Sequence, residues 1–169
     1  MNNLTVPINA TDRKRAMGLA KERMQTFNQA RVRNQKIDRG RDSVQTHYIG
    51  LIGEITIEKI IGIPLTNHKA PHGDGGVYDF IIKDKTVQVK CTDYLSGHLI
   101  FPLKKGKMSF LAEYGILVIW DKKKEIATAV GQITRERFLA EHVIKEWGYG
   151  PTPAVPQHTL DHPWLLEKD

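Results

Sequence analysis

Apolar and polar residues alternate most clearly near the middle of the chain, where the pattern predicts a β-hairpin. Residues 77–82 and 86–92 are the two expected strands, and the polar run at 83–85 predicts a tight turn between them. Successive side chains of a strand point to opposite faces of a sheet. Gln88 and Lys90 are therefore expected on one face of the second strand, with its apolar side chains on the other.

Two segments before this hairpin have helical spacing of their apolar residues. Residues 13–33 keep a modest apolar stripe, with a helix start expected at residues 11–12. Residues 44–61 are apolar on a broad front, which predicts a buried helix. Ser43 is the expected N-cap of this second helix, and Gly62 is the expected stop.

The pattern after the hairpin predicts further sheet and one more helix. Residues 115–120 form a continuous apolar run, as expected for a central strand covered on both faces. We also expect strands at 98–103 and 126–130, a short helix at 108–114 and a helix capped by Thr134. The Pro-rich tail from Gly148 is expected to be irregular, with four anchoring side chains: Leu160, Trp164, Leu165 and Leu166.

Length and composition fit a single domain that is long enough to bury a core. The 169 residues are 40% hydrophobic and 26% charged, which is ordinary for a soluble globular protein. We expect a helical segment with a linker at 1–42, followed by a core with its tail at 43–169. The chain has no apolar run long enough to span a membrane and a polar N-terminus, so we expect a cytoplasmic protein with no membrane partner. The single cysteine, Cys91, is expected to be a packed core thiol in a reducing compartment.

The net charge of +6 is concentrated at the N-terminus. Residues 1–45 hold ten Lys or Arg against four Asp or Glu, whereas the rest of the chain holds fifteen of each. A concentrated positive segment attracts a polyanion, most commonly nucleic acid, although a solvated helix face is the alternative. The candidate DNA-binding residues are Arg13, Lys14, Arg15, Arg31 and Arg33, together with Lys104, Lys105 and Lys107 in a basic turn.

Four side chains are candidates for chemistry. Asp79 lies in the first strand of the hairpin and is expected beside Gln88 and Lys90 of the second. Glu54 lies on the buried helix among apolar residues, and a carboxylate in such a setting usually has a cation partner. Gly50 and Gly53, beside it, would let another backbone come close. An acid, an amide oxygen and an ammonium on one face suit a site for a hard metal ion and a phosphate.

The order of these stretches resembles the PD-(D/E)XK nuclease superfamily. The matching segments are GLIGEITIEKIIGIP, YDF and VQVKCT, followed by GILVIW and AVGQITRERF, over about residues 46–140. The resemblance implies an α/β, restriction-endonuclease-like fold, with a central mixed β-sheet flanked by helices. Tyr78 stands where the family has proline, and Gln88 stands where an acid is usual. This makes the chain a QXK variant similar to small homing endonucleases.

The resemblance implies a metal-dependent DNA endonuclease that hydrolyses phosphodiester bonds of double-stranded DNA. Asp79, the Gln88 side chain, the Val89 carbonyl and Glu54 would hold Mg²⁺, with Mn²⁺ able to substitute. Lys90 would orient the attacking water or stabilise the developing negative charge. Because cutting both strands usually requires two active sites, the expected partner besides DNA is a second copy, in a homodimer or tetramer.

Other interpretations remain open at this point. The chain can be an inactive DNA-binding protein of the same fold, a junction resolvase or repair nuclease, or a subunit that scaffolds a nucleoprotein complex. Asp79 can also form a structural ion pair with Lys90, and Glu54 can form a salt bridge elsewhere. Three histidines need no role in chemistry: His47 fits a core or surface position, and His68 and His72 fit a DNA-facing loop better than a zinc site.

Overall fold

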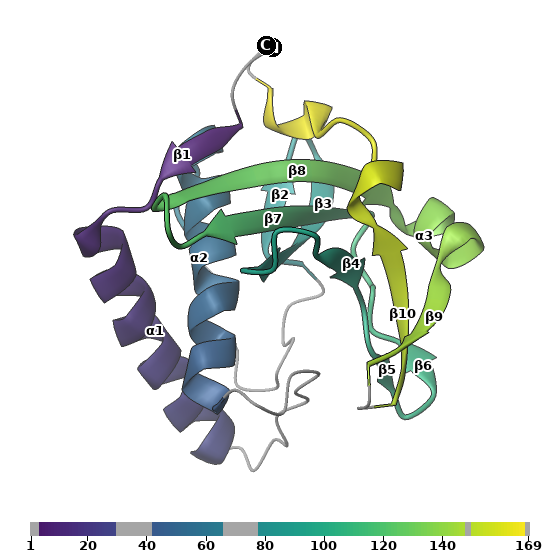
Figure 1. Cartoon of the computed structure of the whole chain (residues 1–169), viewed down its shortest axis with the longest axis horizontal. Coiled ribbons are helices and arrows are strands. Elements are labelled where there is room, and N and C mark those ends of the chain that lie inside the picture. The colour runs from purple at the N-terminus through teal and green to yellow at the C-terminus, as the bar shows by residue number, and fades with distance from the viewer. Residues whose placement is uncertain (1–3, 30–41, 66–77, 148–149, 168–169) are drawn as a thin grey trace.

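The computed structural model describes residues 4–29, 42–65, 78–147 and 150–167 (Figure 1). The helices of this part of the chain are α1 (Ala10–Gln29), α2 (Ser43–Ile61) and α3 (Arg135–Glu141), with 3-10 turns at Gln157–Thr159 and Trp164–Leu166. The strands are β1 (Thr5–Pro7), β2 (Phe80–Ile82), β3 (Lys85–Thr92), β4 (His98–Ile100), β5 (Leu103–Lys104), β6 (Lys107–Met108), β7 (Tyr114–Asp121), β8 (Ile126–Thr134), β9 (Val143–Glu146) and β10 (Pro151–Pro156).

A mixed, curled sheet forms the centre of the molecule, which agrees with the expected α/β class. Its strand order is β1-β8-β7-β3-β2. The pair β3 and β7 is parallel, whereas the other neighbours are antiparallel. Helices α1 and α2 lie side by side on one side of this sheet, and the smaller sheet β4-β10-β9 lies with α3 on the other (Figure 1). The protein is therefore a mixed α/β protein.

Strand β7 is buried on both faces, as its continuous apolar sequence predicts. Ile116, Val118 and Trp120 belong to the core cluster that includes α1 and α2. Leu117 and Ile119 belong to a second cluster on the opposite face, built largely from aromatic rings. The central sheet thus separates two apolar cores.

The first helix is fastened to the second by ion pairs along their shared length. It begins at Ala10, slightly before the expected start, because Asn9 and Asp12 exchange hydrogen bonds between side chain and backbone at its N-terminus. Asp12 also pairs with Lys59 of α2. One turn further on, both guanidinium nitrogens of Arg15 bind the Glu58 carboxylate, at 2.6 and 2.8 Å.

The second helix has the predicted end and a different N-cap. Asp42, rather than Ser43, caps α2, because its carboxylate accepts a hydrogen bond from the Gln45 amide at 2.7 Å. Gly62 adopts a left-handed conformation (φ 73°) and its amide bonds to Glu58, which ends the helix where the sequence predicts.

The predicted hairpin is formed by β2 and β3. Lys83 and Asp84 both have positive φ, the geometry of a two-residue turn whose twist matches the strands. Asp79 stands immediately before β2, and its amide still bonds to the Val87 carbonyl. Cys91 is partly buried and packs on the core beneath α2, as expected.

Two expectations for residues 98–114 are wrong. The single strand expected at 98–103 is divided into β4 and the start of a small hairpin, and β4 joins the second sheet instead of the central one. Where a short helix is expected after the basic turn, β5 and β6 form that hairpin, and residues 109–113 are irregular. The positive φ of Lys105 and Gly106 turns the chain back on itself, which a helix cannot do.

The Pro-rich tail is a strand, where an irregular segment is expected. The helix after Thr134 ends at Glu141, and the chain then pairs β9 with β10. Pro151 lies where β10 has only β9 as a neighbour, and Pro156 lies where it has only β4. The missing N–H of these two prolines therefore breaks no ladder. Pro153 pairs with β9, and its carbonyl accepts a hydrogen bond from the Phe101 amide on the other side at 3.3 Å.

The end of the tail is anchored to the central sheet, as predicted. Leu165 and Leu166 are buried in the core beneath α2, and Leu160 packs on the opposite cluster. The Leu165 amide donates to the side-chain oxygen of Gln132 at 3.3 Å. Trp164, by contrast, is 44% exposed and stacks edge-on against Tyr114.

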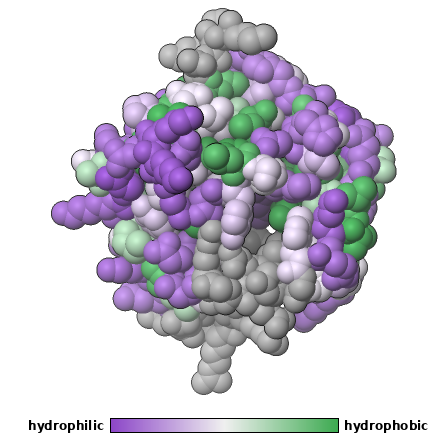
Figure 2. All heavy atoms as spheres, in the orientation of Figure 1, coloured by the Kyte–Doolittle hydropathy of each residue, from purple (hydrophilic) through white to green (hydrophobic). Residues whose placement is uncertain are grey.

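The visible surface is divided by polarity. Hydrophilic side chains predominate over α1, at the left of Figure 2, while apolar side chains gather at the right edge, where α3 and β9 lie. Those exposed apolar residues include Leu139, Val143 and Ile144. None of the helices in the described ranges is long and apolar enough to cross a membrane.

Candidate functional site

The candidate site begins with the close approach of α2 to β3. A Cβ placed on Gly53 would lie 2.5 Å from the Cβ of Cys91 and 3.4 Å from a methyl carbon of Val89, so only glycine lets the helix lie this close to the strand. Gly50, which also looked suited to a close approach, has no atom within 4 Å of such a Cβ. The contact at Gly53 brings the next residue, Glu54, beside the strand.

Glu54 is paired with an arginine of the first helix. Its carboxylate is nearly enclosed, with 7% of the side chain exposed, and it accepts two hydrogen bonds from the guanidinium of Arg23 at 3.1 and 3.2 Å. This is the cation partner that a buried carboxylate requires. The partner comes from a helix whose basic residues are expected at the surface.

Asp79 lies in the same electrostatic environment. Its carboxylate accepts a hydrogen bond from the Val89 amide at 2.7 Å. The residue as a whole is partly exposed, whereas its carboxyl group is enclosed, and burial is the main cause that raises the pKa of Asp79 to about 7. The negative charge of Glu54 raises this pKa further, while the Val89 amide, Lys90 and Arg23 oppose the shift. The two carboxylates therefore lie within electrostatic range of each other.

Lys90 is on the opposite face of β3 from the residues that pack beneath α2. Its ammonium lies 5.2 Å from the centre of the Phe101 ring, a cation–π contact. It nevertheless stabilises the charged form of Asp79. Asp79 therefore lies within electrostatic range of Glu54 and Arg23, which belong to the helices on one face of the sheet, and of Lys90 on the other face.

Gln88 serves the backbone instead of the site. Its side-chain oxygen accepts hydrogen bonds from the amides of Leu111 at 3.0 Å and Ala112 at 3.3 Å, and the residue is buried. An amide oxygen has two lone pairs, so both are used. Gln88 thus holds the irregular segment before β7 against β3. Metal binding through this oxygen would require both hydrogen bonds to break.

The oxygen atoms that remain for a metal ion are few. Two enclosed carboxylates, of Glu54 and Asp79, interact electrostatically, and the Val89 carbonyl belongs to the strand residue whose amide binds Asp79. Within the described ranges, no three His, Cys, Asp or Glu residues gather as a metal site. Mg²⁺ needs only one or two carboxylates when water and phosphate oxygens complete its shell. This donor set therefore fits Mg²⁺ bound together with a phosphate substrate.

His47 lies at the edge of this site. It is buried on α2, two turns before Glu54, and burial together with the charge of Arg23 lowers its pKa to about 4. It is neutral at physiological pH. Arg23 was not predicted from the sequence, in which an acid among the apolar residues of α2 is the one signal for such a cation. His68 and His72 lie outside the described residues.

The candidate DNA-binding residues have mixed settings. Arg13 pairs with Glu125 and Arg15 pairs with Glu58, so both are engaged within the molecule. Lys14 is exposed on α1. The other lysines of the candidate set lie on the β5–β6 hairpin, where Lys105 and Lys107 are exposed and Lys104 is partly buried. Arg31 and Arg33 lie outside the described residues.

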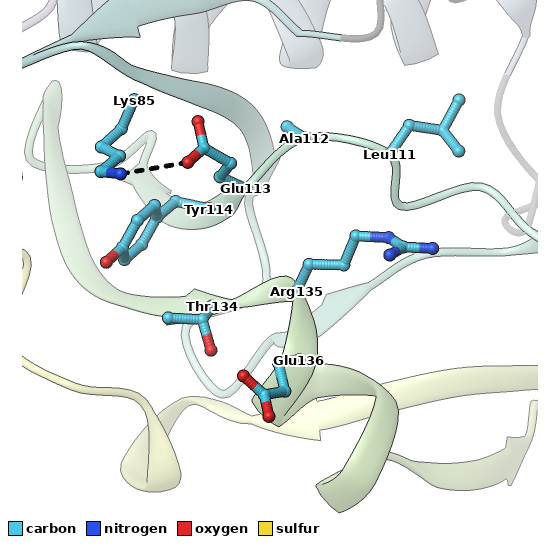
Figure 3. Close-up of a pocket in the computed structure, with 8 residues that line it drawn as sticks. All are labelled: Lys85, Leu111, Ala112, Glu113, Tyr114, Thr134, Arg135 and Glu136. Carbon is cyan, nitrogen blue, oxygen red and sulfur yellow. Dashed lines mark hydrogen bonds and ion pairs between the residues drawn. The ribbon is translucent and has the colours of Figure 1, made fainter.

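A separate pocket of about 390 Å³ lies near the start of β3 and β7 (Figure 3). Several of its polar groups are engaged: Lys85 pairs with Glu113, which also accepts from the Thr86 amide, and the Arg135 side chain donates to the Phe110 carbonyl. We favour the site around Glu54 as the functional site, because its carboxylates are enclosed, whereas 48% of the Glu113 side chain is exposed. The residues that line the pocket are Lys85, Leu111, Ala112, Glu113, Tyr114, Thr134, Arg135 and Glu136.

Comparison of the chain with models of protein families, with curated proteins and with solved structures finds no match. The site must therefore be judged from its own geometry and chemistry.

Proposed function

We propose that this protein is a Mg²⁺-dependent endonuclease with a restriction-endonuclease-like fold that hydrolyses double-stranded DNA. One observation carries the proposal: the enclosed carboxyl group of Asp79 lies within electrostatic range of both the Glu54 carboxylate and the Lys90 ammonium. Two enclosed acids close together destabilise a protein unless a cation accompanies them. The net charge of +6 supports a polyanionic substrate.

Asp79, Glu54 and the Val89 carbonyl would hold the metal ion. When bound, Mg²⁺ supplies a Lewis acid for the scissile phosphate and lowers the pKa of a coordinated water. The raised pKa of Asp79 fits this role, because a bound cation would favour its charged form. Two active sites are needed to cut both strands, so we include a homodimer or tetramer in the proposal.

Lys90 would act on the phosphate and the attacking water. Its ammonium donates hydrogen bonds only, so it can stabilise the negative charge that develops on the phosphate oxygens. The Phe101 ring beneath it is fully buried and restrains the position of the ammonium. A group held in place before the reaction needs little reorganisation when charge develops.

The test is cleavage of plasmid and linear DNA in Mg²⁺ by Lys90→Met, which keeps the apolar stem and removes the charge. We expect cleavage to fall by at least about 100-fold, while DNA affinity measured in Ca²⁺ changes little. Lys85→Met is the matched control, because Lys85 lies on the same strand and pairs with Glu113 outside the site. Cleavage by Lys90→Met at the rate of the unsubstituted protein would refute the assignment of Lys90.

A DNA-binding protein without chemistry is the second candidate. Two observations favour it: Glu54 already has a cation partner in Arg23, and the Gln88 oxygen is occupied by backbone amides. This alternative predicts DNA binding that is indifferent to Mg²⁺, and no cleavage of linear, circular, branched or single-stranded DNA. Mg²⁺-dependent cleavage that Asp79→Ala abolishes would exclude it.

A further inference from the structure

Glu54 is a proposed metal ligand, yet it forms an ion pair with Arg23. Metal binding alone does not explain this pair. The guanidinium binds the carboxylate through both terminal nitrogens, and only 16% of the Arg23 side chain and 7% of the Glu54 side chain are exposed. Both oxygens of Glu54 are thus engaged by the protein's own cation. A metal ion that uses this carboxylate must share it with Arg23 or displace it.

The charge of Arg23 reaches beyond Glu54. It also stabilises the charged form of Asp79 and disfavours protonation of His47. The guanidinium therefore lies within electrostatic range of both candidate ligands. It supplies the positive charge that a divalent cation would supply if it were bound between them.

Helix α1 has other attachments to α2. Lys59 binds Asp12 and the Pro7 carbonyl, and Arg15 binds Glu58 through two hydrogen bonds. Ala16 and Ala20 are fully buried against the core. These contacts hold the helix without Arg23. The Arg23–Glu54 pair therefore acts on the charge of the site more than on the position of the helix.

We propose that Arg23 is the resident cation of this site and that a divalent metal ion displaces its guanidinium from Glu54. This inference rests on the proposed function, because it assumes that Glu54 is a metal ligand. Arg23 keeps the site charge-balanced before the metal binds, so the metal and the guanidinium compete for one carboxylate. Once displaced, the guanidinium is available to a phosphate oxygen of the substrate.

Competition makes a prediction that a purely structural arginine does not make. In Arg23→Gln the carboxylate is released, so we expect the affinity for Mn²⁺, measured by calorimetry without DNA, to increase at least about fivefold. Arg15→Gln is the matched control: it removes an equivalent guanidinium–carboxylate pair from the same two helices, away from Asp79. We expect its Mn²⁺ affinity to equal that of the unsubstituted protein.

The outcomes separate this inference from the proposed function. Mn²⁺ binding that is unchanged or weaker in Arg23→Gln would overturn the competition and leave the metal site standing. No Mn²⁺ binding by any of the three proteins would overturn both. If Arg23→Gln does not fold, the Arg23 Nε–H resonance of the unsubstituted protein is followed during a Mg²⁺ titration: a shift at saturation supports displacement, and an unmoved resonance refutes it.

Discussion

Gly53 of α2 lies so close to Cys91 of β3 that a Cβ on the glycine would stand 2.5 Å from the Cβ of the cysteine. The close contact is part of the candidate site, because Glu54 is the next residue and reaches its position only if the helix can approach the strand. One missing methyl group therefore places a carboxylate beside Asp79.

Replacing Gly53 by alanine should force the helix away from the strand. We expect Gly53→Ala to lower the free energy of unfolding by about 1–3 kcal/mol, as overpacking of a core does, and to weaken metal binding. Gly50→Ala is the control in the same helix: nothing lies within 4 Å of the added Cβ, so helix propensity should raise stability by about 0.5–1 kcal/mol. Urea denaturation of both variants measures the difference; equal effects would contradict the close contact.

Asp79 should make stability depend on pH in a specific direction. Its pKa is raised from the usual 3.8 to about 7 in the folded protein, so the folded state binds the proton more tightly than the unfolded state does. The contribution of protonated Asp79 to stability is present below about pH 4 and is lost as the pH rises through about 7. Asp79→Asn, which mimics the protonated form, should be more stable than the unsubstituted protein at pH 8, by about 2 kcal/mol.

The difference in stability between Asp79→Asn and the unsubstituted protein should shrink towards zero at about pH 4.5. Urea denaturation at this pH and at about pH 8 measures the difference. The comparison between variants is needed because His47 has the opposite effect: its lowered pKa costs stability as the pH falls. Asp84→Asn, in the exposed turn of the hairpin, is the control and should show no such divergence. A pH-independent effect of Asp79→Asn would mean that its carboxyl group is not enclosed.

Gln88 should prove structural. In Gln88→Met, the amides of Leu111 and Ala112 lose their acceptor, so we expect the free energy of unfolding to fall by about 1–3 kcal/mol. The affinity for Mn²⁺ should change less than twofold, because the oxygen of Gln88 is not among the proposed ligands. Loss of metal binding without loss of stability would restore Gln88 as a ligand.

Much of the local structure could be predicted because its causes are local. The hairpin with its turn at Lys83–Asp84, the stop at Gly62 and the cap at Thr134 depend on residues within a few positions of one another. The apolar run of β7 likewise predicts a strand covered on both sides. The strand in the Pro-rich tail was not predicted, since it depends on pairing with β4 and β9, which lie elsewhere in the chain.

The sequence by itself determined the carriers of the candidate chemistry: an acid on a buried helix, an acid before a strand, and a lysine on the next strand. Only the tertiary structure decided how they are used. Arg23 and Glu54 are 31 residues apart, and Gln88 and Leu111 are 23 apart, so neither pairing leaves a trace in local periodicity. The alternation of side chains along a strand indicates which face of the sheet a residue occupies. The partner that the residue contacts there depends on how distant elements pack. This packing decides whether a polar atom is free for a ligand or already bound within the protein.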